Sequence, residues 1–168
     1  MTIRAGERLP AGTLMEMNEV AAPGCPAGPV SVRVEDETRG KRIVIFGLPG
    51  AFTPTCSEKH VPGYVASSGE FRARGVHEIW CISVNDAFVM GAWGRNLGSA
   101  GRVRLLADGN GDYTRALGLD VDLSARGMGT RSRRYSMLVE DGVVQFLHVE
   151  EPGKFGVSDA QSMLVRLP

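Results

Sequence analysis

Short apolar runs alternate with longer amphipathic stretches along the middle of this chain. The apolar runs predict buried strands, and the stretches between them repeat their apolar residues with a helical period. The predicted elements are strand 42–46, helix 54–74, strand 78–84, helix 87–97, strand 103–107 and a short helix at 113–117. Strands that alternate with helices indicate parallel crossovers. The pattern therefore predicts an α/β sandwich.

The two ends of the chain depart from this alternation. Before residue 42, two short strands are predicted at 14–17 and 30–34, and the Pro/Gly-rich segment 23–29 between them is a loop. After residue 134, strand candidates at 135–140 and 143–149 flank Asp141-Gly142, a favoured two-residue hairpin turn. An antiparallel pair is therefore expected after the parallel part.

The last periodic stretch predicts one more helix. It covers Asp159–Leu167 and follows Ser158, which we interpret as its N-cap. Within the predicted helix 54–74, Pro62 should cause a kink near the first full turn, because proline has no N–H to donate.

Length and charge exclude several classes of function. The 168 residues, of 18.0 kDa, suit one domain spanning 1–168 with one active centre. The 19 basic residues equal the 19 acidic ones, so no global field would attract nucleic acid or a membrane surface. No apolar run approaches the roughly 18 residues of a membrane span. We expect a soluble protein with a small or uncharged substrate.

The amino terminus and the cysteines bear on location and chemistry. Residues 1–10 show neither a long apolar core nor an Arg/Ser-rich presequence, so we expect a cytoplasmic location. Cys25, Cys56 and Cys81 form no C-x-x-C pair and no metal-binding spacing, and their odd number argues against a secreted disulfide framework. The sequence favours redox chemistry at one reactive thiol, with no metal.

Cys56 has the most distinctive local setting of the three. It follows the apolar strand 42–46, and Thr53-Pro54 reads as a helix start with Thr53 as N-cap and Cys56 at the third helical position. A second register takes Thr55 as the cap, with Glu58 completing a capping box. Either register places the sulfur beside unpaired backbone amides, which stabilise an anion. The alternative is a buried thiol with a purely structural role.

The residues around Cys56 form the pattern P-x-x-x-T-x-x-C, from Pro49 through Thr53 to Cys56. This pattern resembles the peroxidatic motif of peroxiredoxins. The longer string 48–57 and the following His60-Val-Pro-Gly-Tyr64 are similar to the subfamily of type II and peroxiredoxin-5 proteins. Further matches lie at 83–89, 93–95, 104–108 and 133–137, so the resemblance runs from about Lys41 to Val149.

The resemblance implies a thioredoxin fold with extra N-terminal strands, arranged as a three-layer α/β/α sandwich. It implies a thiol peroxidase of antioxidant defence that reduces hydrogen peroxide and alkyl hydroperoxides without a cofactor. Cys56 would be the attacking thiolate and would become a sulfenic acid. Thr53 would orient the peroxide, and Pro49 would limit the access of water. Arg134 would stabilise the thiolate and hold the peroxide oxygens.

Strand alternation places Arg134 on the opposite face of its strand from Arg133, but it does not say which face contains the sulfur. His60 is one helical turn after Cys56 and on the same face, where it either tunes the thiol or packs and bonds to backbone. Cys25 lies in a loop and is assigned no catalytic part.

The route of recycling is left open by the sequence. Cys81 follows Cys56 by 25 residues (81 − 56), a spacing that the resemblance associates with a resolving thiol. Its setting is the centre of an apolar strand, which favours a buried structural thiol. The other route is direct attack on the sulfenic acid by an outside thiol, glutathione with glutaredoxin or thioredoxin. We favour the outside thiol.

Two other functions compete with the peroxidase. A thioredoxin-like disulfide exchanger is disfavoured, because Lys59 occupies the position of the second thiol of C-x-x-C. A non-enzymatic redox sensor or holdase oxidised at Cys56 would react once and stop. The resemblance also implies a homodimer that contacts through Phe52, Phe88 and Trp93, close to the active site.

Overall fold

A seven-stranded mixed sheet forms the centre of the protein. In the computed structural model, which describes residues 1–168, the strands lie in the order β2-β1-β5-β4-β3-β8-β9. Their bounds are β1 (Thr13–Asn18), β2 (Gly28–Arg33), β3 (Arg42–Gly47), β4 (Glu78–Ser83), β5 (Arg104–Ala107), β8 (Tyr135–Glu140) and β9 (Val143–Val149). The predicted alternation is confirmed, since β3, β4 and β5 are parallel neighbours. β1 and β8 flank them in antiparallel register.

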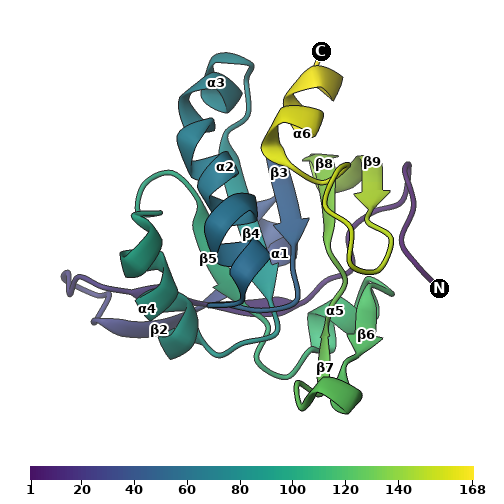
Figure 1. The fold of residues 1–168 in the computed structure, drawn as a ribbon. Helices are drawn as coiled ribbons and strands as arrows, with labels where there is room; N and C mark the ends of the chain where they lie inside the picture. The colour runs from purple at the N-terminus through teal and green to yellow at the C-terminus, as the bar shows by residue number, and fades with distance from the viewer.

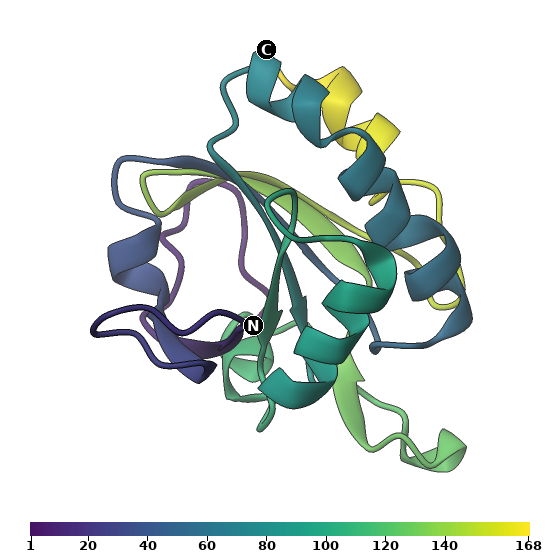
Figure 2. The same cartoon turned by 90° about the vertical axis from the view of Figure 1, so that its left-hand side faces the viewer.

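Helices cover both faces of this sheet, as Figures 1 and 2 show. Their bounds are α1 (Val34–Glu37), a π-helical turn η1 (Cys56–His60), α2 (Val61–Ala66), α3 (Ser68–Ala73), α4 (Ala87–Leu97), α5 (Asp112–Ala116) and α6 (Ala160–Arg166). One buried cluster includes side chains of η1, α2, α3, α4 and α6, and the other includes those of α1, α5 and the N-terminal segment. The predicted three-layer arrangement is confirmed. No helix combines the length and the apolar character that a membrane span requires.

The period of two along the strands decides which side chains enter which cluster. In β3, Val44 and Phe46 belong to the cluster under η1 and α2, whereas Ile43 and Ile45 belong to the opposite one. The β8–β9 turn is also as predicted, because Asp141 and Gly142 both have positive φ, at 47° and 74°.

Several local predictions are wrong. The helix predicted at 54–74 is divided into η1, α2 and α3, and a boundary falls at Ser67. The N-cap of α6 is Asp159, whose side chain accepts from the N–H of Ser162, and not Ser158. A small sheet of β6 (Asp120–Asp122) and β7 (Thr130–Ser132), with the 3₁₀ turn η2 (Ser124–Arg126) between them, was not predicted. It projects from the body of the protein (Figure 2).

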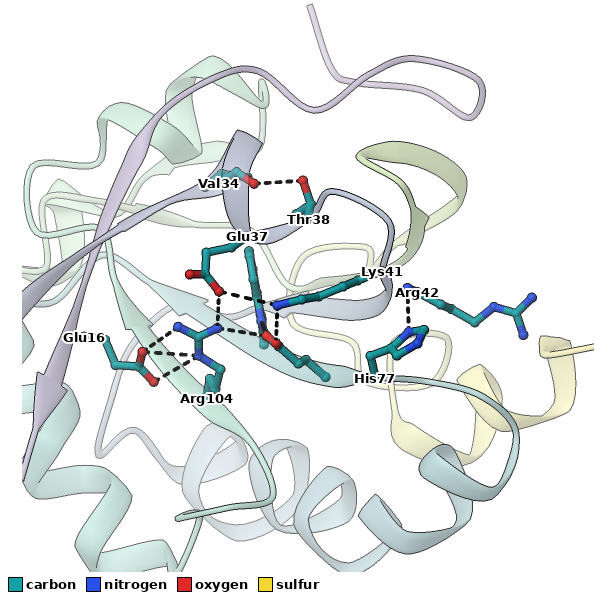
Figure 3. A network of polar contacts seen from close by, with 10 residues as sticks. Glu16, Val34, Glu37, Thr38, Lys41, Arg42, His77 and Arg104 are labelled. Carbon is teal, nitrogen blue, oxygen red and sulfur yellow. Dashed lines mark hydrogen bonds and ion pairs between the residues drawn. The ribbon is translucent and has the colours of Figure 1, made fainter.

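An ion-pair network joins β1 and α1 to the central strands β4 and β5 of the sheet (Figure 3). Arg104 of β5 contacts Glu16 of β1 at 2.7 Å, Glu37 of α1 at 3.0 Å and Glu78 of β4 at 2.8 Å. Lys41 contacts the other oxygen of Glu78 at 2.7 Å. Three carboxylates from separate elements thus share one guanidinium, which fixes α1 and β1 to the central strands β4 and β5.

Replacing Arg104 with methionine should destabilise the fold by about 2 to 3 kcal/mol, because three partly buried carboxylates would lose their common cation. Urea unfolding measures this change. The control is Arg95→Met, which breaks the Arg95–Glu19 pair, where both side chains are about half exposed. That variant should lose less than about 1 kcal/mol. Equal losses in the two variants would contradict a structural role for the network.

Candidate active site

Cys56 lies where the chain turns from the end of β3 into the helical layer. It is the first residue of η1, and its side chain is fully buried. Thr53 directly precedes the helical residues Pro54 and Thr55, so the first of the two predicted registers is the correct one. The adjacent Phe52 has a left-handed φ of 61°, which is strained for an aromatic residue.

The π-helical turn has a local cause in Pro62. An α-helical residue 62 would donate its N–H to the carbonyl of Glu58, but proline has no N–H, and its ring clashes with that carbonyl. The turn widens instead, and the N–H of Val61 donates to the carbonyl of Cys56. The predicted kink at Pro62 therefore takes the form of a π-helical turn that begins at Cys56.

Two backbone amides beside the sulfur have no acceptor within the protein. Neither the N–H of Thr55 nor that of Cys56 donates a hydrogen bond, whereas the next amide, of Ser57, donates to the carbonyl of Thr53 at 3.0 Å. Free amides at the start of a helix favour negative charge nearby. This part of the sequence-based prediction agrees with the structure.

The Thr53 hydroxyl is held in an orientation that the sequence did not indicate. It donates to the carbonyl of Gly50 at 2.7 Å, so Thr53 occupies the N-cap position although its side chain accepts no hydrogen bond from a helix amide. Because its proton is committed to Gly50, the oxygen lone pairs remain free to accept a hydrogen bond. The neighbouring carbonyl, of Pro49, accepts from Arg131 at 3.3 Å. The two contacts fix the loop that precedes Cys56.

Arg134 reaches the sulfur directly. Its Nη2 donates to Sγ of Cys56 at 3.2 Å, although the two residues are 78 positions apart. It precedes β8, where Leu138 belongs to the same buried cluster as Cys56 and Tyr135 to the opposite one. Arg134 therefore lies on the face of the sheet that contains the Cys56 sulfur, a point that strand alternation had left open. Of the neighbouring arginines, Arg131 contacts the Pro49 loop instead.

His60 is a buried neutral imidazole that links Arg134 to the C-terminal segment. Its Nδ1 is 2.9 Å from Nη1 of Arg134, and its Nε2 is 3.1 Å from the carbonyl of Ser158. Since arginine can only donate, Nδ1 is the acceptor and Nε2 carries the proton. Burial, followed by the positive charge of Arg134, lowers the pKa of His60 to about 3. Of the two interpretations from the sequence, the bond to backbone is confirmed, and tuning of the thiol stays a prediction.

The other two cysteines have different settings. Cys81 lies in β4, fully buried in the same cluster as Cys56, and burial raises the pKa of its thiol. Cys25 is exposed in the β1–β2 connection, where its sulfur accepts from Asn18 at 3.3 Å. The structure forms no disulfide among the three.

The aromatic residues predicted at a dimer contact differ in exposure. Phe52 is 55% exposed and Phe88 is 66% exposed. Trp93 is fully buried, and its Nε1 donates to the hydroxyl of Ser57, one residue after Cys56. In this structure Trp93 supports the helix start from inside and offers no surface for a contact.

Comparison with known proteins places this geometry in a family. A family model described as Redoxin matches residues 4–164. Peroxiredoxin-2E of Arabidopsis thaliana, a chloroplastic protein, is 48% identical over 99% of this chain and 70% of its own length. The chain belongs to the peroxiredoxin family. It is thus an α/β thiol-dependent peroxidase of antioxidant defence, as the motif around Cys56 predicted.

Two solved structures agree with this peroxiredoxin fold. Reduced Prx3 from Vibrio vulnificus, in complex with hydrogen peroxide, is 43% identical with a TM-score of 0.91 and covers 99% of this chain and 100% of its own. A Burkholderia cenocepacia protein, provisionally named a thioredoxin reductase, is 59% identical with a TM-score of 0.98 and covers 100% and 99% of the two chains. The likeness confirms the thioredoxin-type fold with added N-terminal strands.

The comparison corrects one prediction. A cytoplasmic location was inferred from residues 1–10, but the Arabidopsis relative that matches nearly the whole chain is chloroplastic. The first ten residues therefore did not determine the compartment.

The buried His60 should make folding stability depend on pH. The unfolded imidazole takes up a proton near pH 6.5, whereas the folded one resists protonation until about pH 3. Stability should therefore be complete above pH 6.5 and fall as the pH drops, by about 1.4 kcal/mol per pH unit well inside this window. Urea unfolding of the parent and of His60→Asn between pH 4 and 8 isolates this contribution from other titrating groups. Parallel curves for the two proteins would contradict it.

Proposed function

We propose that Cys56 is the peroxidatic nucleophile and that Thr53, Pro49 and Arg134 form its peroxide site. The observation that carries the proposal is the 3.2 Å contact between the Arg134 guanidinium and the Cys56 sulfur, beside two free backbone amides. A fixed cation and unpaired donors around a buried sulfur favour the thiolate, which is the reactive form of cysteine.

The proposed reaction balances within this site. The thiolate attacks the terminal oxygen of a hydroperoxide, an S–O bond forms and the O–O bond breaks. Sulfur is oxidised by two electrons to a sulfenic acid, and the departing oxygen leaves as water or an alcohol after taking up a proton. Negative charge moves from sulfur to the leaving oxygen, so the guanidinium and the free amides stabilise the transition state. The lone pairs of Thr53 can accept from the peroxide and orient it.

We further propose that an outside thiol recycles the sulfenic acid. Redoxin membership is consistent with a thioredoxin-type reductant, and glutathione with glutaredoxin is the second candidate. Cys81 is fully buried, and burial raises the pKa of its thiol, so it remains protonated and unreactive in the folded protein. Its alternative role as a resolving thiol would require local unfolding of β4.

The surface beside the site supports a homodimer contact in this proposal. Phe52 and Phe88 are large apolar side chains that remain mostly exposed, and Phe52 keeps its strained backbone without any gain from burial. A partner of the same chain would cover both rings. Trp93 is removed from the proposed contact because it is buried.

Peroxide turnover tests the assignment of Cys56 and Arg134. With glutathione and glutaredoxin, or thioredoxin and its reductase, Cys56→Ser should consume no hydroperoxide above background. Arg134→Lys should lower kcat/KM by roughly 10²-fold, because lysine supplies the charge without the planar fork. A Cys56→Ser variant as active as the parent would refute the proposal. A parent that oxidises once and does not turn over with either reductant would favour the alternative of a redox sensor or holdase.

A second experiment separates the two recycling routes. Cys81→Ser should keep turnover within about twofold of the parent, since the outside thiol does not need the buried cysteine. Mass spectrometry after one equivalent of peroxide should show a sulfenic acid or, with glutathione, an adduct at Cys56. A Cys56–Cys81 disulfide, together with loss of turnover in Cys81→Ser, would show that Cys81 resolves instead.

A further inference from the structure

One carboxylate oxygen organises the loop that covers the active-site histidine. Glu150 follows β9 and is only 5% exposed. Its Oε1 accepts from the N–H groups of Gly156 and Val157 at 2.7 Å each, from the N–H of Ser158 at 2.8 Å and from the Ser158 hydroxyl at 2.9 Å. The carboxylate thus closes the loop formed by residues 151–157, because it binds the last two residues of the loop and Ser158, which follows it.

The charge on this carboxylate is stabilised by the loop itself. Burial disfavours the ionised form, but the hydrogen bonds from Val157, Gly156 and Ser158 outweigh it and lower the pKa of Glu150. Hydrogen bonds to a charged acceptor are roughly twice as strong as those between neutral groups. The closed loop therefore depends on an ionised side chain at position 150.

The end of this loop holds His60. The carbonyl of Ser158 accepts from the Tyr64 hydroxyl at 2.8 Å and from Nε2 of His60 at 3.1 Å, and all three residues are fully buried. His60 in turn accepts from Arg134 at 2.9 Å, and Arg134 donates to Sγ of Cys56 at 3.2 Å. A continuous series of hydrogen bonds therefore runs from Glu150 to the reactive sulfur.

Further contacts join Phe155 of the loop, and Glu150 just before it, to Arg134. The Phe155 ring lies 5.6 Å from Cζ of Arg134 in a cation–π arrangement and meets the His60 ring edge-on at 5.0 Å. The backbone N–H of Glu150 donates to the carbonyl of Arg134 at 2.9 Å. The backbone of Arg134 is thus held by Glu150 itself. The guanidinium is held by Phe155 of the loop and, through His60, by Ser158 directly after the loop.

We infer that Glu150 is a positioning residue for the peroxidase reaction, which acts by closing the 151–157 loop and thereby fixing His60 and Arg134 against the Cys56 sulfur. The inference rests on the proposed function. Glu150 has no contact with the sulfur, so its effect on the reaction passes through His60 and Phe155. Displacing a transition-state donor by about 1 Å can slow a reaction by roughly 10²-fold.

Glu150→Gln tests the inference, with Glu151→Gln as the matched control. Glutamine keeps the shape but removes the charge, and Glu151 is an exposed neighbour whose side chain makes no hydrogen bond. Single-turnover oxidation by hydrogen peroxide should slow by roughly tenfold or more in Glu150→Gln and by less than about twofold in Glu151→Gln. Reduction of the preformed sulfenic acid by a small thiol, measured in the same proteins, should stay within about twofold in both.

A double-mutant cycle distinguishes positioning from a general loss of structure. In a His60→Asn background, Glu150→Gln should slow oxidation by a smaller factor than in the parent, because the series of hydrogen bonds is already broken and only the Phe155 contact still joins the loop to the guanidinium. Additive effects of the two substitutions on the oxidation rate would overturn the inference. If Glu150→Gln does not fold, judged by near-UV circular dichroism, Ser158→Ala replaces it. That variant removes one donor to the carboxylate and should slow oxidation by about two- to fivefold in the parent and by a smaller factor in His60→Asn.

These outcomes are separate from those that bear on the proposed function. Oxidation by peroxide that persists in Cys56→Ser would refute the assignment of the nucleophile, whatever happens at Glu150. Oxidation that requires Cys56 but is unchanged in Glu150→Gln would overturn the inference and leave the proposed function intact.

Discussion

The contact between the Arg134 guanidinium and the Cys56 sulfur is the interaction on which the rest of the site depends. It brings together the start of the first long helical segment and the start of β8, 78 residues apart. The pairing of β3 with β8 makes this possible, since Gly47 at the end of β3 lies opposite Tyr135 at the beginning of β8. The segment that follows β3 and contains Cys56 therefore lies at the same end of this strand pair as Arg134, which precedes β8.

A partly buried arginine beside a fully buried histidine raises an electrostatic problem, because two cations could not coexist there. The structure resolves it by keeping His60 neutral, with Nδ1 accepting from Arg134 and Nε2 donating to Ser158. The guanidinium is then the only cation of that pair, and its remaining contacts are the sulfur and the face of Phe155. Its positive charge is therefore directed at the Cys56 sulfur, where it favours the thiolate over the thiol.

Supports of different kinds hold residues 49–57, the loop and helix start around Cys56. Pro62 widens the helix at Cys56, Trp93 donates to Ser57 from the core, and Arg131 fixes the carbonyl of Pro49. A glycine is needed at position 50 for the last of these contacts, because a Cβ there would lie 2.8 Å from Nη1 of Arg131. Residues far from the sulfur in sequence thus fix the loop that precedes Cys56 and hold donors in place around its sulfur.

Local patterns in the sequence determined the strands of the seven-stranded sheet, α4, the β8–β9 hairpin and the P-x-x-x-T-x-x-C motif, because each of these depends on residues within one turn or one strand. The sequence did not determine which face of its strand Arg134 occupies, the neutral state of His60, the burial of Trp93 or the part played by Glu150. Each of these is set by neighbours 36 to 98 residues away, such as Ser57 for Trp93 and Ser158 for His60, or by a loop closed around one carboxylate. Periodicity predicts which element a residue belongs to and which of its neighbours share its face. Only the pairing of strands and the closure of loops decides which atoms its side chain contacts.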